Sequence, residues 1–110
     1  MTHECSKMPD LEIRLEGDAA IVAPQRDLLS SSVPEMRVAM RDLVQSGVRR
    51  LVVDLNAASL IDSTAVGLFV AAFNSITKAG GKFSVVHASV EVLELLRGMR
   101  IHQHFAVSGR

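Results

Sequence analysis

The feature that most limits the fold of this chain is a strand, helix and strand pattern in residues 51–87. Leu51–Leu55 is a nearly continuous apolar run, which predicts a strand buried on at least one face. A helix is expected from about Ser63 to Ala79, ended by Gly80-Gly81, and a second strand from Lys82 to His87. Strands joined in this way lie parallel, with the helix packed on one face of the sheet. The pattern therefore predicts an α/β fold.

The residues before this unit predict a hairpin and a further helix. Apolar residues alternate in Leu11–Leu15, Gly17-Asp18 predicts a turn, and Ala19–Ala23 follows as the second strand of an antiparallel pair. Ser32 and Glu35 are spaced as a capping box, which starts a helix with one buried face. That face is formed by Val33, Met36, Met40, Leu43 and Val44.

The remaining residues lie at the two ends of the chain. Ser89 is expected to cap a last helix, and Ile101–Val107 to return as a short strand or extended segment. Residues 1–10 are polar and show no periodicity, so we expect a flexible N-terminal tail. Since 110 residues is the size of one ordinary domain, residues 11–110 are expected to form a single domain.

Charge and composition exclude several classes of function. The 12 basic residues balance 12 acidic ones, so the chain lacks the basic patch that attracts nucleic acid or an anionic membrane. Cys5 is the only cysteine, which excludes an internal disulfide and favours a reducing compartment. The longest apolar run, Ala65–Phe73, is far too short to span a membrane, and the N-terminus has no signal-peptide core. We therefore expect a soluble, cytoplasmic protein.

The connection formed by residues 56–63, which we call the elbow, is where a functional site is expected. It leaves the carboxyl end of a predicted parallel strand, where sites gather in α/β sheets. Either Asp62 or Ser63 is expected to cap the following helix, because both residue types are preferred there. A second interpretation is that Ser63 is phosphorylated, which adds about two negative charges at the surface. Asp62 would repel that phosphate, so the effect would fall on the docking of a partner.

The helix after the elbow offers a docking surface. Its run Ala65–Phe73 is apolar nearly all round, whereas a helix on a sheet hides only one face. Gly67, Ala71 and Ala72 are small, so they would leave a flat surface on which another backbone could pack. It is equally open that neighbouring helices of the same chain cover this surface.

Two long segments resemble the STAS domain of bacterial anti-sigma factor antagonists. They read VRRLVVDLNAASLIDSTAVGLFVAAFNSITKAGGKFSVV and SVEVLELLRGMRIHQHF, and the similarity extends from about Leu11 to Val107. Its most specific parts are the strand ending in Asp54-Leu55, the Ile61–Ser63 tripeptide, Gly67, the Ala79–Lys82 turn and Met99-Arg100. The resemblance implies a STAS fold, with a four- or five-stranded mixed sheet and helices packed on it.

The resemblance also implies a function and a set of partners. The chain would bind an anti-sigma factor that is itself a serine kinase, and phosphorylation of Ser63, with Thr64 as second choice, would switch binding off. A serine phosphatase would reverse the modification, and the chain would be a monomer or weak homodimer. The implied partner-binding residues are Asp27, Asn56, Ala58, Ser59, Asp62, Ser63, Thr64, Val66, Gly67 and Val70.

Two positions depart from the family pattern. The family elbow usually continues Asp-Ser-Ser-Gly-Leu-Gly, whereas Ala65 replaces the first of these glycines. The earlier loop, typically Gly-Glu-Leu-Asp, reads Pro24-Gln25-Arg26-Asp27. The alanine bears on how closely a kinase can approach the backbone of the elbow, and the changed loop bears on which partner the chain binds. The alternative function is a STAS adaptor or scaffold in a two-component or stress-signalling assembly, with Ser63 acting only as a helix cap.

Three other interpretations lack residues that they require. A receiver domain could use Asp54 as its phosphoacceptor, but Pro24-Gln25 stands where acidic residues would hold Mg²⁺. A hydrolase could use Ser63 and His87, but the chain has no Gly-x-Ser-x-Gly nucleophile turn. A metal site would draw on the scattered residues His3, Cys5, His102 and His104. We therefore expect no catalytic activity, no cofactor and no metal.

Overall fold

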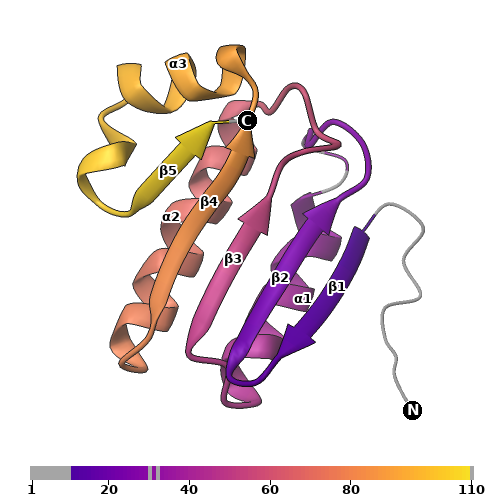
Figure 1. The fold of residues 1–110 in the computed structure, drawn as a ribbon, viewed down its shortest axis with the longest axis vertical. Coiled ribbons are helices and arrows are strands. Elements are labelled where there is room, and N and C mark those ends of the chain that lie inside the picture. The colour runs from indigo at the N-terminus through magenta and orange to yellow at the C-terminus, as the bar shows by residue number, and fades with distance from the viewer. Residues whose placement is uncertain (1–10, 30, 32, 110) are drawn as a thin grey trace.

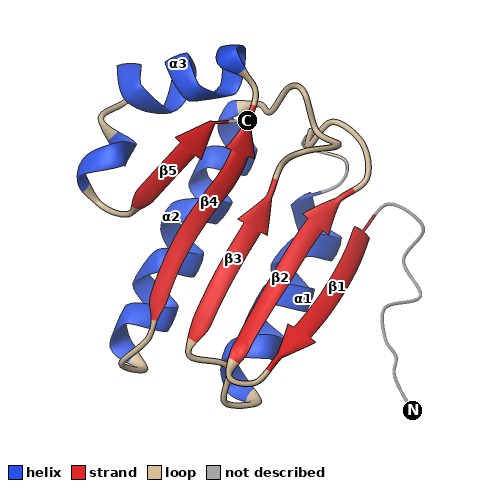
Figure 2. Ribbon diagram, viewed as in Figure 1, coloured by secondary structure: helices blue, strands red, loops and turns tan. Residues whose placement is uncertain are grey.

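The protein folds around a five-stranded sheet with its two longest helices on one face (Figures 1 and 2). The computed structural model describes residues 11–29, 31 and 33–109. The strands lie side by side in chain order: β1 (Leu11–Glu16), β2 (Ala19–Pro24), β3 (Arg50–Asp54), β4 (Lys82–Ala88) and β5 (Ala106–Gly109). The helices are α1 (Val33–Gln45), α2 (Ser63–Lys78), α3 (Val90–Gly98) and the short 3₁₀ helix η1 (Ile101–Gln103).

The sheet is mixed, as predicted. β1 and β2 form the predicted antiparallel hairpin, whose turn contains Gly17 with φ of 64°. All later neighbours are parallel, because α1, α2 and α3 each return the chain to the same end of the sheet. The predicted α/β architecture is therefore confirmed.

The main core lies between the sheet and the helices α1 and α2, which run side by side behind it in Figure 1. Leu51 and Val53 on β3 are fully buried beneath them, whereas Val52 lies on the opposite face and is only partly buried. The ring of Phe69 on α2 is fully buried and lies 6.2 Å from that of Phe83 on β4, measured between centroids. The strand pattern thus directs one face of the sheet to the helices.

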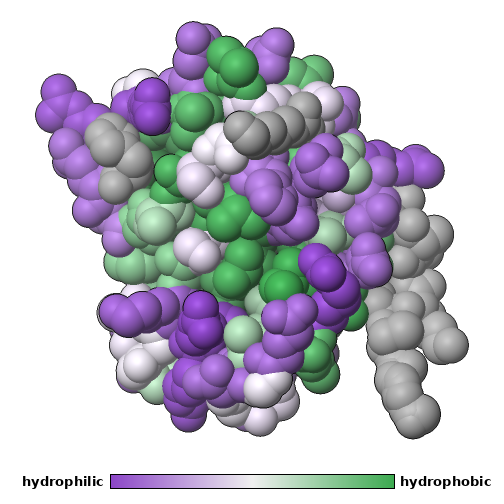
Figure 3. All heavy atoms as spheres, viewed as in Figure 1, coloured by the Kyte–Doolittle hydropathy of each residue, from purple (hydrophilic) through white to green (hydrophobic). Residues whose placement is uncertain are grey.

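The opposite face of the sheet is the one seen in Figure 3. Apolar atoms gather over the middle of the sheet, and hydrophilic groups surround them. No helix among the described residues crosses this face in Figure 2. α3 instead lies beyond the carboxyl ends of β4 and β5.

The C-terminal segment differs from the prediction. Ile101–Val107 was expected to return as a short strand or extended segment; its first three residues instead form η1, and the strand β5 starts only at Ala106. Arg100 adopts a left-handed conformation with φ of 61°, and the His104 N–H donates to Ile101 O across 2.8 Å. This local turn replaces an extended path. The predicted tail of residues 1–10 and the predicted Ser32 cap lie outside the described residues.

Candidate functional site

The elbow leads directly into α2, and Asp62 is the residue that caps this helix. Asp62 has extended backbone angles, φ −109° and ψ 180°, and its Oδ1 accepts from the Ala65 N–H at 3.1 Å. Ser63 is the first helical residue, and its side chain is exposed. The structure thus decides between the two predicted caps. The interpretation of Ser63 as the helix cap is wrong, because the side chain of Asp62 accepts the hydrogen bond from the Ala65 N–H at the start of the helix.

A pair of single substitutions checks this assignment. Asp62→Ala is expected to lower the free energy of unfolding by about 1 kcal/mol, because it removes the cap. Ser63→Ala is expected to change it by less than about 0.5 kcal/mol, since the Ser63 side chain is exposed. Urea unfolding followed by circular dichroism measures both values. A larger loss for Ser63→Ala than for Asp62→Ala would contradict the assignment.

Two residues of the loop between β2 and α1, Asp27 and Leu28, are hydrogen-bonded to the elbow. The Leu28 N–H donates to Leu60 O at 3.0 Å, and the Asp62 N–H donates to Leu28 O at 3.2 Å. The Asp27 carboxylate adds two bonds, because its Oδ1 accepts from the N–H groups of Ser59 at 3.0 Å and Leu60 at 3.2 Å. Asp27 therefore acts as a clamp between the two loops, and it brings them to one edge of the molecule.

A third segment, the start of α3, holds the elbow from the other side. Ser89 is the predicted cap of α3, and its Oγ accepts from the Val92 N–H at 3.2 Å. The same hydroxyl donates to Ser59 O at 2.7 Å, and Ser89 is the one polar residue among the described residues that is buried. The sequence contained a signal for the cap but none for the bond to Ser59. That bond requires α3 to end up beside the elbow.

The predicted partner-binding residues fall into three groups by exposure. Ala58 is 0% exposed and Val66 3% exposed, so their side chains face the core and hold the elbow and α2 in place. Three others, Asp27, Asp62 and Val70, are partly buried. The exposed ones are Asn56, Ser59, Ser63, Thr64 and Gly67.

The predicted docking face of α2 is smaller than the apolar run suggested. Ala72 is buried, whereas Gly67 and Ala71 are exposed. Residues of α1 cover one side of the helix, and the sheet covers another. A narrow strip of small side chains, starting at the elbow, remains open along α2.

A second polar cluster lies at the carboxyl end of β3 and β4. Asp54 Oδ1 accepts from the Asn56 N–H at 2.9 Å and lies 2.9 Å from His87 Nδ1, while Arg14 Nη2 is 4.0 Å from Asp54 Oδ2. His87 has a φ of 59°. Burial alone raises the pKa of Asp54, but the bond from Asn56 and the interactions with His87 and Arg14 outweigh it and lower that pKa below 3.8. Asp54 thus joins β1, β3 and β4.

The pH dependence of the free energy of unfolding should reveal the lowered pKa of Asp54. A lowered pKa means that the folded state favours the carboxylate, so its contribution is present above pH 3.8 and disappears as the pH falls through the lower folded value. We expect Asp54→Asn to be less stable than wild type at neutral pH, with the difference shrinking below pH 3.8. Urea unfolding at a series of pH values measures this difference. A difference that does not change with pH would contradict the assigned contacts.

The residues proposed for a metal site do not form a cluster in the part of the chain that the structure describes, where no three His, Cys, Asp or Glu gather. His3, Cys5 and the side chain of His102 lie outside it. His104 is exposed, with its ring 6.2 Å from that of Phe73.

Within residues 11–29, 31 and 33–109, no helix has the length and apolar character to cross a membrane.

Known proteins match the chain by family and by fold. The STAS domain family model matches residues 10–108. No curated protein sequence matches at a significant level. Among solved structures, a proposed anti-sigma factor antagonist from Thermotoga maritima has a TM-score of 0.85 at 20% identity, covering 91% of this chain and 86% of that chain.

Two further structures share the fold. An anti-sigma factor antagonist from Mycobacterium paratuberculosis has a TM-score of 0.81 at 18% identity, covering 94% of this chain and 90% of its own. The Bacillus cell fate determinant SpoIIAA in its phosphorylated form has a TM-score of 0.73 at 13% identity, covering 88% and 89%. At such identities the likeness is one of fold. Because the family model spans almost the whole chain, this protein belongs to the STAS domain family.

Proposed function

We propose that the chain is a regulator of the anti-sigma factor antagonist type. It binds an anti-sigma factor that is also a serine kinase, and phosphorylation of Ser63 switches this binding off. The observation that carries the proposal is the position of Ser63, exposed at the first turn of α2 on an elbow that two other segments hold in place. In this proposal the protein works in the cytoplasm, as a monomer or weak homodimer, and a serine phosphatase restores binding.

The local electrostatics favour an effect on docking over an effect on folding. A phosphate on Ser63 would lie at the N-terminal end of α2, where the helix dipole tolerates negative charge. The adjacent Asp62 carboxylate would repel it, but Asp62 keeps its bond to the Ala65 N–H without help from Ser63. The fold would therefore survive. A partner that packs against the exposed Thr64 and Gly67 would instead have to desolvate the new charge.

The departure at Ala65 is compatible with this proposal. Ala65 is 0% exposed, so its methyl group points into the core and leaves the outer surface of the elbow unchanged. Asp27 keeps the residue type of the family loop and clamps the elbow through its carboxylate. Both observations support an elbow with the shape that a kinase or binding partner would need.

Affinity capture tests the proposal directly. Wild-type chain and Ser63→Asp serve as baits in a cell lysate, and mass spectrometry identifies what each retains. We expect a serine kinase of the anti-sigma type on the wild-type bait only. The purified kinase with ATP should then modify Ser63, as located by mass spectrometry with Ser63→Ala as control. Equal retention of one partner by both baits would favour the constitutive adaptor instead.

A further inference from the structure

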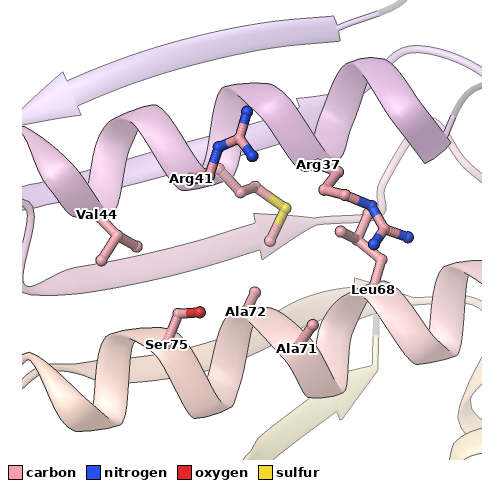
Figure 4. A pocket seen from close by; sticks show the side chains of 8 residues that line it. Arg37, Arg41, Val44, Leu68, Ala71, Ala72 and Ser75 are labelled. Atoms are coloured by element: carbon pink, nitrogen blue, oxygen red, sulfur yellow. The ribbon is translucent and has the colours of Figure 1, made fainter.

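A groove separates α1 from α2 on the outer side of the helical layer (Figure 4). Its volume is about 160 Å³, and it is lined by Arg37, Met40, Arg41, Val44, Leu68, Ala71, Ala72 and Ser75. Met40, Leu68 and Ala72 are buried and form an apolar floor. Figure 4 shows Val44 facing Ser75 and Ala72 across the groove, while Arg37 extends toward Leu68.

Two arginines give the rim of this groove its charge. Arg37 and Arg41 are four residues apart on α1, so they lie one turn apart on the same side of the helix, and both are exposed. In the described ranges, 11–29, 31 and 33–109, neither guanidinium has a carboxylate within ion-pair distance. The opposite rim, on α2, consists of the small residues Ala71 and Ser75 and carries no charge. The groove is therefore apolar inside and positive on one side.

We infer that this groove binds an acidic amphipathic helix of a partner protein. An apolar side chain of that helix enters between Val44 and Ala72, and two carboxylates one turn apart pair with Arg37 and Arg41. The small rim residues on α2 let the partner backbone approach closely. This inference does not rest on phosphorylation of Ser63 or on an anti-sigma factor as partner.

Charge and size favour such a helix over other occupants. In a two-fold dimer through this groove the same patch would face itself, and its lining residues include no carboxylate, so Arg37 and Arg41 would gain no ion-pair partner there. A lipid tail would need a longer apolar channel than about 160 Å³ provides. Carboxylates repeating every turn match both the spacing and the sign of the two arginines.

A random peptide library tests the inference without a known partner. Phage displaying peptides of about 16 residues, some 24 Å as a helix, are selected on the immobilised full chain. We expect enriched peptides to carry Asp or Glu one turn apart beside an apolar residue. Binding of the strongest peptide should fall about 30-fold for the Arg37→Glu/Arg41→Glu variant and about tenfold for Ala71→Phe, which fills the groove without changing its charge.

The matched control is Arg97→Glu/Lys82→Glu. It changes the net charge equally at two exposed residues outside the groove, and binding should be retained. Enrichment of basic or uncharged peptides, or equal binding by all variants, would overturn the inference. The inference would also be overturned if Arg37 and Arg41 were needed for a different kind of association. One such result is self-association of the chain in sedimentation, and the other is binding to phosphatidylglycerol vesicles. Thermal unfolding of each variant establishes that it is folded.

Discussion

Ser63→Asp is expected to weaken binding to the captured kinase partner by at least about tenfold, while the chain stays folded. The new carboxylate stands beside Asp62 at an exposed position, and docking must remove both from water. Removing an unpaired carboxylate from water costs several kcal/mol, whereas a tenfold loss of affinity needs only about 1.4 kcal/mol. Isothermal titration with the purified partner measures the affinity.

Two controls separate the position of the charge from its presence. Asn74→Asp adds the same charge to an exposed site farther along α2, and it should bind the partner like wild type. Ser63→Ala should also bind normally, because it introduces no charge and Asp62 remains the cap. The melting temperatures of all three variants should lie close together. Equal affinities for Ser63→Asp and Asn74→Asp would refute the switch.

Gly81→Ala is expected to cost about 3 kcal/mol of the free energy of unfolding, the largest stability effect among these predictions. A methyl group at this position would collide with Arg49 O and lie 2.7 Å from Ile76 Cγ1. The backbone has little room to move, because the Gly81 N–H donates to Ile76 O and the Lys82 N–H to Arg49 O, each at 2.8 Å. The clash would therefore push the turn after α2 away from Arg49, the residue before β3.

Gly67→Ala is the matched control for this substitution. Gly67 is exposed inside α2, and a methyl group there would have no heavy atom within 4 Å. Alanine is the better helix former, so Gly67→Ala should raise stability by about 0.5 to 1 kcal/mol. Urea unfolding gives both values. If Gly81→Ala unfolded at the same urea concentration as wild type, the close contact between the turn after α2 and Arg49 would be wrong.

Most secondary structure was predictable because its signals are local. The strand β3, the helix α2 and the strand β4 follow from apolar runs and a glycine pair within a single stretch of residues. The segment before β5 was not predicted correctly, because the turn at η1 depends on the left-handed conformation of Arg100. Nothing in the residue types of this segment indicates that conformation.

The location of the candidate site was predictable from the sequence, but its helix cap and the burial of its residues were not. Its location at the elbow follows from the carboxyl end of a parallel strand, and Ser63 lies there as expected. The choice of Asp62 as cap required backbone angles, which residue preference leaves open between Asp and Ser. The burial of Ala58 and Val66 could not be predicted either, because an apolar side chain near the elbow can point toward the core or toward solvent.

The parallel unit, the elbow and the serine at its end depend on neighbours along the chain, so residue patterns alone predict them. Which segments hold the elbow, and where a groove opens, depends on the folded arrangement. Asp27 and Ser89 lie about 30 residues from Ser59, on opposite sides of it in the chain, and the groove joins α1 to α2. Such contacts form only when distant segments pack together, so no local pattern encodes them.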